Sequence, residues 1–371
     1  MQRLTAVLVV GAVGLAACGC GQGGAGAAST GSRSGPVTSA SASRALIVVA
    51  EAPATGYENS PTPVRLMRPD GTVAGRLIVK QGANVVRAGG GRIFVVENDG
   101  ALKAIHPDGS VENLGSVGSG QPNGFAVSPD GTHWMWSTWD TNGVSQVHIA
   151  GDGMSPRVVA QMQSRDQSVH AYSWTGGGAF IDHKPNGIGG YILFDASFGE
   201  VDRLDPNNFT TAPLRSGSCQ FSDQSRDGTV ACFPGSGDPN SRSISIIKKD
   251  GSSKTIQLAM PRFAQDGDAF FSRDGQRLSV AGAANAGTNN QPEQYGTDVI
   301  TTIDASIKRL AIDGVRASDE MQGQAWLDDG SLVVWRPDNA AGAPPAVYLV
   351  GPAGKVTQLG GRGTPIGVIT G

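Results

Sequence analysis

The stretch FAVSPDGTHWMW at residues 125–136 decides how this chain folds. Two short apolar runs flank the dipeptide Asp130-Gly131, and Asp-Gly supplies the positive φ angles that a tight hairpin turn needs. Similar turns recur along the chain from Asp70-Gly71 to Asp329-Gly330. The sequence therefore predicts one β-hairpin after another rather than helices or parallel strands.

The turns form two families that alternate along the chain. If each repeat has four strands, A to D, one family joins A to B and the other joins C to D. The A–B family is Gly89-Gly90-Gly91, Asp130-Gly131, Gly176-Gly177-Gly178, Asp227-Gly228, Asp274-Gly275 and Asp329-Gly330; the C–D family is Asp70-Gly71, Asp108-Gly109, Asp152-Gly153, Phe198-Gly199, Asp250-Gly251, Ala305-Ser306 and Ala353-Gly354. Internal repeats of about 40 to 50 residues with four strands each indicate a β-propeller.

This spacing predicts an all-β, seven-bladed β-propeller of four-stranded antiparallel blades. The blades are expected at about 45–81, 82–117, 118–160, 161–206, 207–260, 261–314 and 315–360. The first blade lacks a strand A, because residues 44–49 already have the pattern of strand B, whereas residues 365–370 have the pattern of a strand A with no blade after it. We expect the C-terminal strand to complete the N-terminal blade, since this pairing removes the open edges of a broken ring.

Residues 1–17 are predicted to be a signal peptide. Arg3 precedes an apolar stretch at 4–15, which is too short to cross a bilayer core of about 30 Å as a helix. Residues 16–18, Ala-Ala-Cys, resemble the lipobox of bacterial lipoproteins. The resemblance implies a diacylglyceryl thioether on Cys18 and cleavage just before it. Ordinary secretory cleavage near Ala27-Ala28, without a lipid, is the alternative.

Residues 21–43 are almost wholly Gly, Ala, Ser and Thr with one proline, so residues 18–43, which begin with Cys18, are expected to be a disordered, flexible linker. No second break in composition occurs in residues 44–371, so this part is expected to form the single propeller domain. Because two or three acyl chains hold a protein on a membrane, we expect a tethered monomer on the outer face of the cytoplasmic membrane of a bacterial envelope.

Composition limits the partners of the chain. The formal net charge is −3 and the pI is near 6.0, with no basic stripe interleaved with aromatic residues, so nucleic acid is not an expected partner. Charged residues make up only 16% and glycines number 54, which suits many tight turns and short strands.

Three segments carry a resemblance to a known family. Ser128–Thr132, Ser225–Thr229 and Ser272–Gln276, each followed by an apolar strand, resemble the WD40-like repeats of TolB-type propeller proteins. The resemblance implies the propeller fold over most of the chain. TolB carries an additional α/β domain where this chain has a Gly/Ser-rich spacer, so the partner-binding role of TolB is not carried over.

Cys219 and Cys232 are expected to form a disulfide. They flank the Asp227-Gly228 turn on strands A and B of one hairpin, in a chain expected to be exported to an oxidising space. Cys219 lies farther from the turn than Cys232, so a bulge is needed to bring the Cα atoms within about 7 Å. Two buried free thiols are the alternative. The cysteines and histidines lack zinc-ligand spacing, and no metal is expected.

The sequence offers no catalytic motif. It lacks Gly-x-Ser-x-Gly, His-Glu-x-x-His, a phosphate loop and a dinucleotide fingerprint. Asp140-Thr141-Asn142-Gly143 begins like a calcium loop but lacks the remaining ligands, so a simple turn is expected there. We therefore assign no catalytic residue and no cofactor.

The two ends of the predicted ring differ. The A–B and C–D turns are short, whereas the B–C connections are long, at 52–62, 137–143, 183–189, 234–241, 283–296 and 336–344. Long loops on a rigid scaffold tend to carry binding residues. Aromatic rings beside Asn, Asp and Arg suit sugars or peptides, because a flat apolar face stacks while polar edges fix orientation. The candidate ligand-binding residues are Tyr57, Glu58, Trp139, Asp140, His183, Lys184, Asn290, Tyr295, Arg336 and Asp338.

Two hypotheses about function follow. The first is a membrane-anchored extracytoplasmic lipoprotein that acts as a binding or scaffold module for a protein, peptide or glycan through its B–C loop face. The alternative is a propeller enzyme of the lyase, glycosidase or lactonase type. Such an enzyme should gather two carboxylates, or a histidine and a carboxylate, with a perturbed pKa at the mouth of the central channel.

Overall fold

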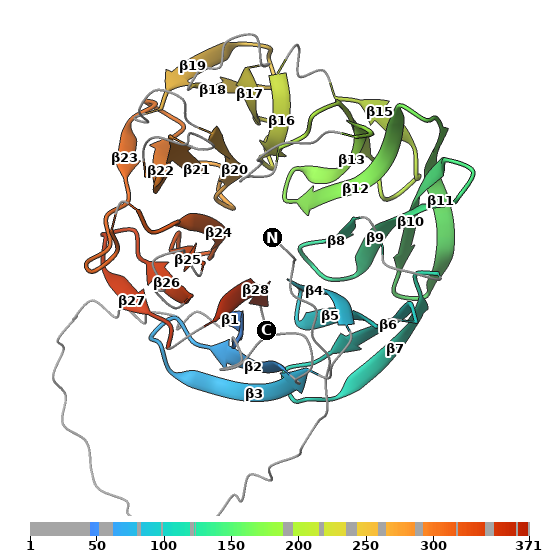
Figure 1. Cartoon of the computed structure of the whole chain (residues 1–371), viewed down its shortest axis with the longest axis horizontal. Helices are drawn as coiled ribbons and strands as arrows, with labels where there is room; N and C mark the ends of the chain where they lie inside the picture. Colours follow the sequence, from blue (N-terminus) through green and yellow to red (C-terminus); the bar gives the residue numbers. More distant parts are fainter. Residues whose placement is uncertain are drawn as a thin grey trace, which may run out of the picture.

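The computed structural model describes residues 45–51, 62–79, 83–97, 99–118, 122, 124–187, 196–214, 219–234, 243–258, 265–285, 292–316, 318–337, 345–360 and 363–369. These residues form seven four-stranded antiparallel sheets that are arranged radially in a ring (Figure 1). Helices are absent from the described ranges. The predicted all-β, seven-bladed propeller is confirmed.

The blades follow one another along the chain, and in each blade the strands A, B, C and D lie side by side in that order. Blade 1 contains β28 (Thr364–Ile369), β1 (Leu46–Ala50), β2 (Thr62–Met67) and β3 (Val73–Val79); blade 2 contains β4 (Ala83–Gly89), β5 (Arg92–Glu97), β6 (Ala101–Ile105) and β7 (Val111–Ser116); blade 3 contains β8 (Phe125–Val127), β9 (His133–Trp139), β10 (Val144–Gly151) and β11 (Met154–Gln163); blade 4 contains β12 (Gln167–Thr175), β13 (Gly178–Pro185), β14 (Glu200–Leu204) and β15 (Thr211–Pro213); blade 5 contains β16 (Cys219–Gln224), β17 (Val230–Pro234), β18 (Ser243–Ile247) and β19 (Ser253–Gln257); blade 6 contains β20 (Gln265–Phe271), β21 (Arg277–Ala284), β22 (Gln294–Thr301) and β23 (Ile307–Arg309); blade 7 contains β24 (Gln322–Trp326), β25 (Leu332–Arg336), β26 (Ala346–Val350) and β27 (Val356–Gln358).

The C-terminal strand closes the ring as predicted. β28 pairs antiparallel with β1, with Leu46 opposite Ile369 and Ile47 opposite Val368. Ile369 is buried in a cluster with Val48 and other residues of blades 1 and 2. Strand A of blade 1 therefore comes from the opposite end of the chain to its other three strands.

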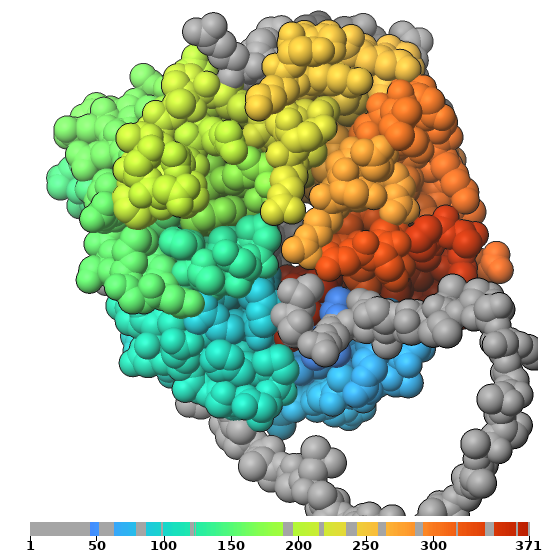
Figure 2. All heavy atoms as spheres, turned by 180° about the vertical axis from the view of Figure 1, so that it is seen from behind, coloured from blue at the N-terminus to red at the C-terminus, as the bar shows by residue number. Residues whose placement is uncertain are grey.

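The hydrophobic core lies between the blades. Phe94 of blade 2 packs against Trp134 of blade 3 with ring centroids 5.7 Å apart, and both side chains are buried. The space-filling view of the reverse side shows adjacent blades in contact around the ring (Figure 2). The A–B turns also touch, because the N–H of Gly90 donates to Pro129 O at 3.0 Å. A Cβ at Gly90, whose φ is +55°, would lie 2.2 Å from Asp130 O, so this contact requires glycine.

Polar side chains also join the inner strands of neighbouring blades. Ser137 Oγ accepts the N–H of Ala171 at 2.9 Å, between blades 3 and 4. The carboxylate of Asp223 on β16 accepts the N–H of Phe271 on β20 at 2.8 Å, between blades 5 and 6. In each bond, a side chain of one blade accepts a backbone N–H from the innermost strand of the following blade, so this N–H has a partner.

Cys219 and Cys232 form a disulfide with their Cα atoms 5.6 Å apart. Phe221 lies opposite Cys232, and the register of β16 against β17 shifts between Phe221 and Asp223. This bulge adds one residue to β16 and puts Cys219 on the same face of the hairpin as Cys232. Cys219 itself lies opposite Pro234, so the disulfide joins diagonal positions rather than directly paired ones.

The prediction for the second half of blade 4 is wrong. Phe198-Gly199 is not the C–D turn, because it precedes β14, and the turn lies at 206–208 between β14 and β15. This turn has no glycine: Asp205 Oδ1 accepts the N–H of Asn207 at 2.9 Å, and Phe209 adopts a φ of +62°. Blade 4 therefore ends at Pro213, seven residues beyond the predicted boundary at 206.

The B–C connection of blade 3 is also shorter than predicted. Ser137 and Trp139 belong to β9, so the connection contains only residues 140–143. Blade 2 likewise has a short B–C connection, at 98–100.

Candidate functional site

The antiparallel blades place all B–C connections at one end of the ring and the A–B and C–D turns at the other. Six of the ten candidate residues at the B–C end lie within the described ranges, and they fall into two groups. Trp139, Asp140, His183 and Lys184 belong to the neighbouring blades 3 and 4, whereas Tyr295 and Arg336 belong to the neighbouring blades 6 and 7. Tyr57, Glu58, Asn290 and Asp338 lie outside the described residues, as does Cys18.

Trp139 presents an accessible indole ring at the B–C end of blade 3. It is the last residue of β9 and is 45% exposed, whereas Trp134 and Trp136 of the same strand are buried. Trp139 pairs with Ser145 across the strands, and Ser145 Oγ accepts the N–H of Val169 in blade 4 at 2.9 Å. Because cross-strand partners share one face of a sheet, Trp139 faces blade 4.

The turn that follows Trp139 is held by the side chain of Asp140. Asp140 Oδ1 accepts the N–H of Asn142 and of Val144, both at 2.9 Å. These bonds, the one from Val144 foremost, hold the pKa of Asp140 below its usual value. The carboxylate of Asp140 therefore stabilises the turn that follows Trp139.

The connection into blade 4 is held to the same turn. Ser164 N–H donates to Gly143 O at 3.3 Å, and Asn186 donates from its backbone N–H to Asp166 O at 2.7 Å and from Nδ2 to Arg165 O at 3.0 Å. Trp139 thus precedes a turn that is hydrogen-bonded to the connection into blade 4, in which Arg165 and Asp166 are both exposed.

Blade 4 contributes three groups of interacting polar side chains at this end. His183 Nε2 lies 3.0 Å from Asp202 Oδ2, so this candidate residue is paired with a carboxylate of its own blade. Lys184, the next residue of β13, is exposed. Asp182 accepts the hydroxyl of Ser197 at 2.7 Å, and burial raises the pKa of Asp182.

The third polar group of blade 4 consists of Ser168, His170 and Asn186, none of which is among the candidate residues. Ser168 Oγ donates to Asn186 Oδ1 at 2.7 Å and lies 2.8 Å from His170 Nε2. A hydroxyl has one proton to donate, so His170 Nε2 carries the proton that completes this chain of bonds. The sequence signal for this cluster was only the alternation of Ser168 and His170 on one strand.

Blades 6 and 7 bring Tyr295 and Arg336 to one acidic region. The hydroxyl of Tyr295 donates to Glu293, and Arg336 Nη1 lies 3.8 Å from Asp319 Oδ2. Glu320, the next residue, is 8% exposed and accepts a hydrogen bond from Gln322 Nε2 at 2.7 Å. Burial chiefly, and in addition the charge of Glu293, raise the pKa of Glu320.

The chemistry available to this acidic region is hydrogen bonding and proton exchange. Glu320 can be protonated at a higher pH than an exposed glutamate, and it precedes β24, the innermost strand of blade 7. Asp319 is neutralised by Arg316, at 2.9 Å, and by Arg336. Within the described ranges, no group of three or more His, Cys, Asp or Glu side chains is placed to hold a metal ion, and no helix is long and apolar enough to span a membrane.

Comparisons with known proteins give similarity at the level of fold. No family model matches the chain, and no curated protein sequence matches it. Among solved structures, one of two prolyl endopeptidases is 12% identical with a TM-score of 0.58, over 85% of this chain and 50% of that chain. A putative 6-phosphogluconolactonase from Bacteroides fragilis is 12% identical with a TM-score of 0.52, over 90% and 99%.

TolB from Acinetobacter baumannii is also similar, at 12% identity and a TM-score of 0.45, over 88% of this chain and 66% of that chain. The chain spans only about half the length of the prolyl endopeptidase. At these identities the similarity to the structures with TM-scores above 0.5 shows the propeller fold alone, and a propeller fold does not by itself determine a function.

Proposed function

We propose that this protein is a binding module that is held on the outer face of the cytoplasmic membrane by lipid on Cys18 and binds a glycan, peptide or protein through its B–C face. The observation that carries the proposal is the exposed indole of Trp139 on a hydrogen-bonded surface at that face. The anchor rests on the lipobox resemblance of residues 16–18.

The surroundings of Trp139 suit a ligand with both apolar and hydrogen-bonding surface. An indole ring that is 45% exposed offers a flat apolar face for a sugar ring or a side chain. Arg165 and Asp166 are exposed in the connection that is bonded to the turn after Trp139 through Ser164, and they offer a donor and an acceptor of opposite charge. Because the turn and the neighbouring connection are bonded to each other, little conformational entropy is lost when a ligand binds there.

The proposal is tested with Trp139→Ala and a matched control, Val111→Ala. Val111 is also an exposed apolar residue, at 50%, but it begins β7 beside a C–D turn at the other end of the ring. Binding of the purified chain to panels of soluble oligosaccharides and of extended peptides is measured by isothermal titration calorimetry. Trp139→Ala should weaken binding of the recognised class by about 30-fold, as expected for an aromatic hot spot, and Val111→Ala should leave it unchanged.

Equal affinity of Trp139→Ala and the unmodified chain for every ligand bound would contradict a site at Trp139. A ligand whose binding is lost in Tyr295→Ala but kept in Trp139→Ala would move the site to blades 6 and 7.

A specific observation favours a second candidate function, that of a propeller enzyme. Glu293 and Glu320 interact electrostatically at the B–C end, and the pKa of Glu320 is raised, as a general acid requires. If the chain turns over an oligosaccharide or lactone, and Glu320→Gln loses this turnover but still binds the compound, the protein is an enzyme rather than a binding module.

A further inference from the structure

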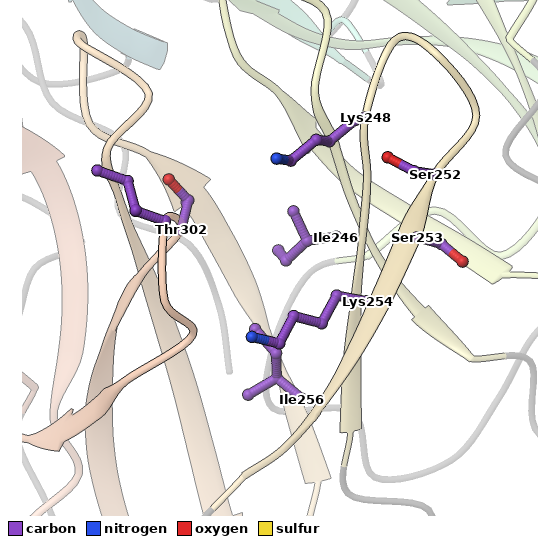
Figure 3. A pocket seen from close by; sticks show the side chains of 8 residues that line it. Ile246, Lys248, Ser252, Ser253, Lys254, Ile256 and Thr302 are labelled. Atoms are coloured by element: carbon purple, nitrogen blue, oxygen red, sulfur yellow. The ribbon is translucent and has the colours of Figure 1, made fainter.

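Two lysine side chains line a pocket between blades 5 and 6, at the end of the ring opposite the B–C face. The pocket has a volume of about 190 Å³ and lies between the C–D hairpin of β18 and β19 and the C–D turn that carries Thr302 and Ile303. Lys248 and Lys254 extend from the hairpin towards Thr302 in the close view (Figure 3). Two neighbouring blades therefore supply opposite walls of one pocket.

The ammonium groups of both lysines retain N–H donors for a ligand. Lys254 Nζ donates to Asp304 O at 3.0 Å, which holds it across the groove between the blades and leaves two of its three N–H groups. Within the described residues, Lys248 Nζ has neither a hydrogen bond nor an ion pair.

The nearest carboxylates are engaged in their own turns. Asp250 Oδ1 accepts the N–H of Ser252 at 2.9 Å and its hydroxyl at 2.6 Å. Asp304 Oδ1 accepts the N–H of Ser306 at 2.9 Å. In the part of the chain that the structure describes, neither carboxylate forms an ion pair with a lysine of the pocket. Asp250 interacts with the charge of Lys248 and Asp304 with that of Lys254 at longer range, so the positive charge of the pocket is reduced but not cancelled.

The floor of the pocket is apolar. Ile246 and Ile256 are 4% and 6% exposed, whereas Ile303 at the rim is 75% exposed, the most exposed of the large hydrophobic residues described. The hydroxyl of Thr302 donates to Gly275 O at 2.9 Å, so its oxygen is left as an acceptor. A ligand must therefore bring negative charge to the lysines and apolar surface to the isoleucines.

The geometry points to a site for a small organic phosphate, a phosphoryl group with a short alkyl segment. A phosphoryl group carries a charge of about −1.5 to −2 and three acceptor oxygens, so it can accept from two separate ammonium groups. Lysine binds phosphate as a point charge, whereas a planar carboxylate is better matched by the fork of arginine, which this pocket lacks. At about 30 Å³ for each water, the volume corresponds to about six waters, enough for this group and a few carbons.

The site is tested with n-butyl phosphate as the probe, titrated into the purified full chain and followed by ³¹P NMR. Lys248→Gln and Lys254→Gln should each weaken binding about tenfold, because each removes charge-assisted hydrogen bonds. Lys249→Gln is the matched control: Lys249 is exposed, as Lys248 and Lys254 are, and carries the same charge on the same turn, but it does not line the pocket. Its affinity should be unchanged.

The apolar floor is tested with two further probes. Inorganic phosphate should bind more weakly than n-butyl phosphate in ³¹P NMR, and an excess of n-butanol should not displace n-butyl phosphate, because both the charge and the alkyl segment contribute. Absence of n-butyl phosphate binding, equal weakening by Lys249→Gln, or equal affinity for inorganic phosphate would each overturn the assignment. Since Trp139 lies at the other end of the ring, the result is independent of the proposed function.

Discussion

At the residue scale, the aspartates of this chain occupy two contrasting environments. In the turns the carboxylate accepts hydrogen bonds from the residue two positions on, as in Asp108, which accepts the N–H and hydroxyl of Ser110. The bond from the N–H of Ser110 chiefly, and the one from its hydroxyl in addition, lower the pKa of Asp108. Asp223 is instead 3% exposed and accepts the N–H groups of Phe271 and Gln224. Burial outweighs these bonds and raises the pKa of Asp223 to about 7.

The raised pKa of Asp223 predicts a pH dependence of stability. The folded chain keeps a proton on Asp223 that the unfolded chain loses near its ordinary pKa of 3.8, so the folded state binds more protons between about pH 4 and 7. Stability therefore falls as the pH rises through this window. Between pH 5 and 8 Asp223 should lower the free energy of unfolding by about 3 kcal/mol.

Urea denaturation at pH 5 and pH 8 measures this effect. In Asp223→Asn the loss of stability between the two pH values should be smaller by that amount, because the amide does not titrate. Asp108→Asn is the control and should leave the difference unchanged, since the pKa of Asp108 lies below the window. An unchanged difference in Asp223→Asn would assign the pH dependence to other groups.

At the scale of elements, β28 and the turns determine how the blades are completed. β28 pairs with β1 along Leu46–Ala50, and Ile369 is 1% exposed in the cluster between blades 1 and 2. Without β28, the inner edge of β1 would present unpaired backbone groups, and an apolar cluster would be opened.

Removal of residues 364–371 is therefore expected to destabilise the whole ring. Burial of Ile369 alone is worth about 2 kcal/mol, and the ladder of β28 with β1 is lost as well, so the melting temperature should fall by several degrees. A synthetic peptide of residues 363–371 should restore part of the loss, whereas a scrambled peptide should not. A truncated chain that melts at the unchanged temperature would show that the closure contributes little.

At the scale of the whole molecule, the two ends of the ring differ in chemistry. The end with the A–B and C–D turns carries aspartates that accept hydrogen bonds within those turns, and the lysine pocket between blades 5 and 6. The B–C end carries Trp139 and the acidic region of blades 6 and 7. A linker at residues 18–43, as predicted from composition, would leave both ends accessible on a membrane surface.

Cys18→Ser tests the proposed anchor. If Cys18 carries the lipid, the variant should move from the membrane fraction to the soluble extracytoplasmic fraction of a bacterial host, because the acyl chains are lost. Its melting temperature should be unchanged, since the propeller begins beyond residue 44. Equal membrane association of the variant and the unmodified chain would contradict attachment through Cys18.

The sequence by itself determined the blade count and the closing strand, because a hairpin turn and the alternation beside it depend on adjacent residues. It left two free thiols as an alternative to the Cys219–Cys232 disulfide, which the structure shows. The turn at 206–208 escaped prediction because Asp205 and Phe209 replace the glycine that usually marks such a turn. Only the tertiary structure decided which blades meet, and with them the bond from Phe271 to Asp223 and the proximity of Glu293 to Glu320. These contacts join residues tens of positions apart through the packing of neighbouring blades, and no local pattern in the sequence records that packing.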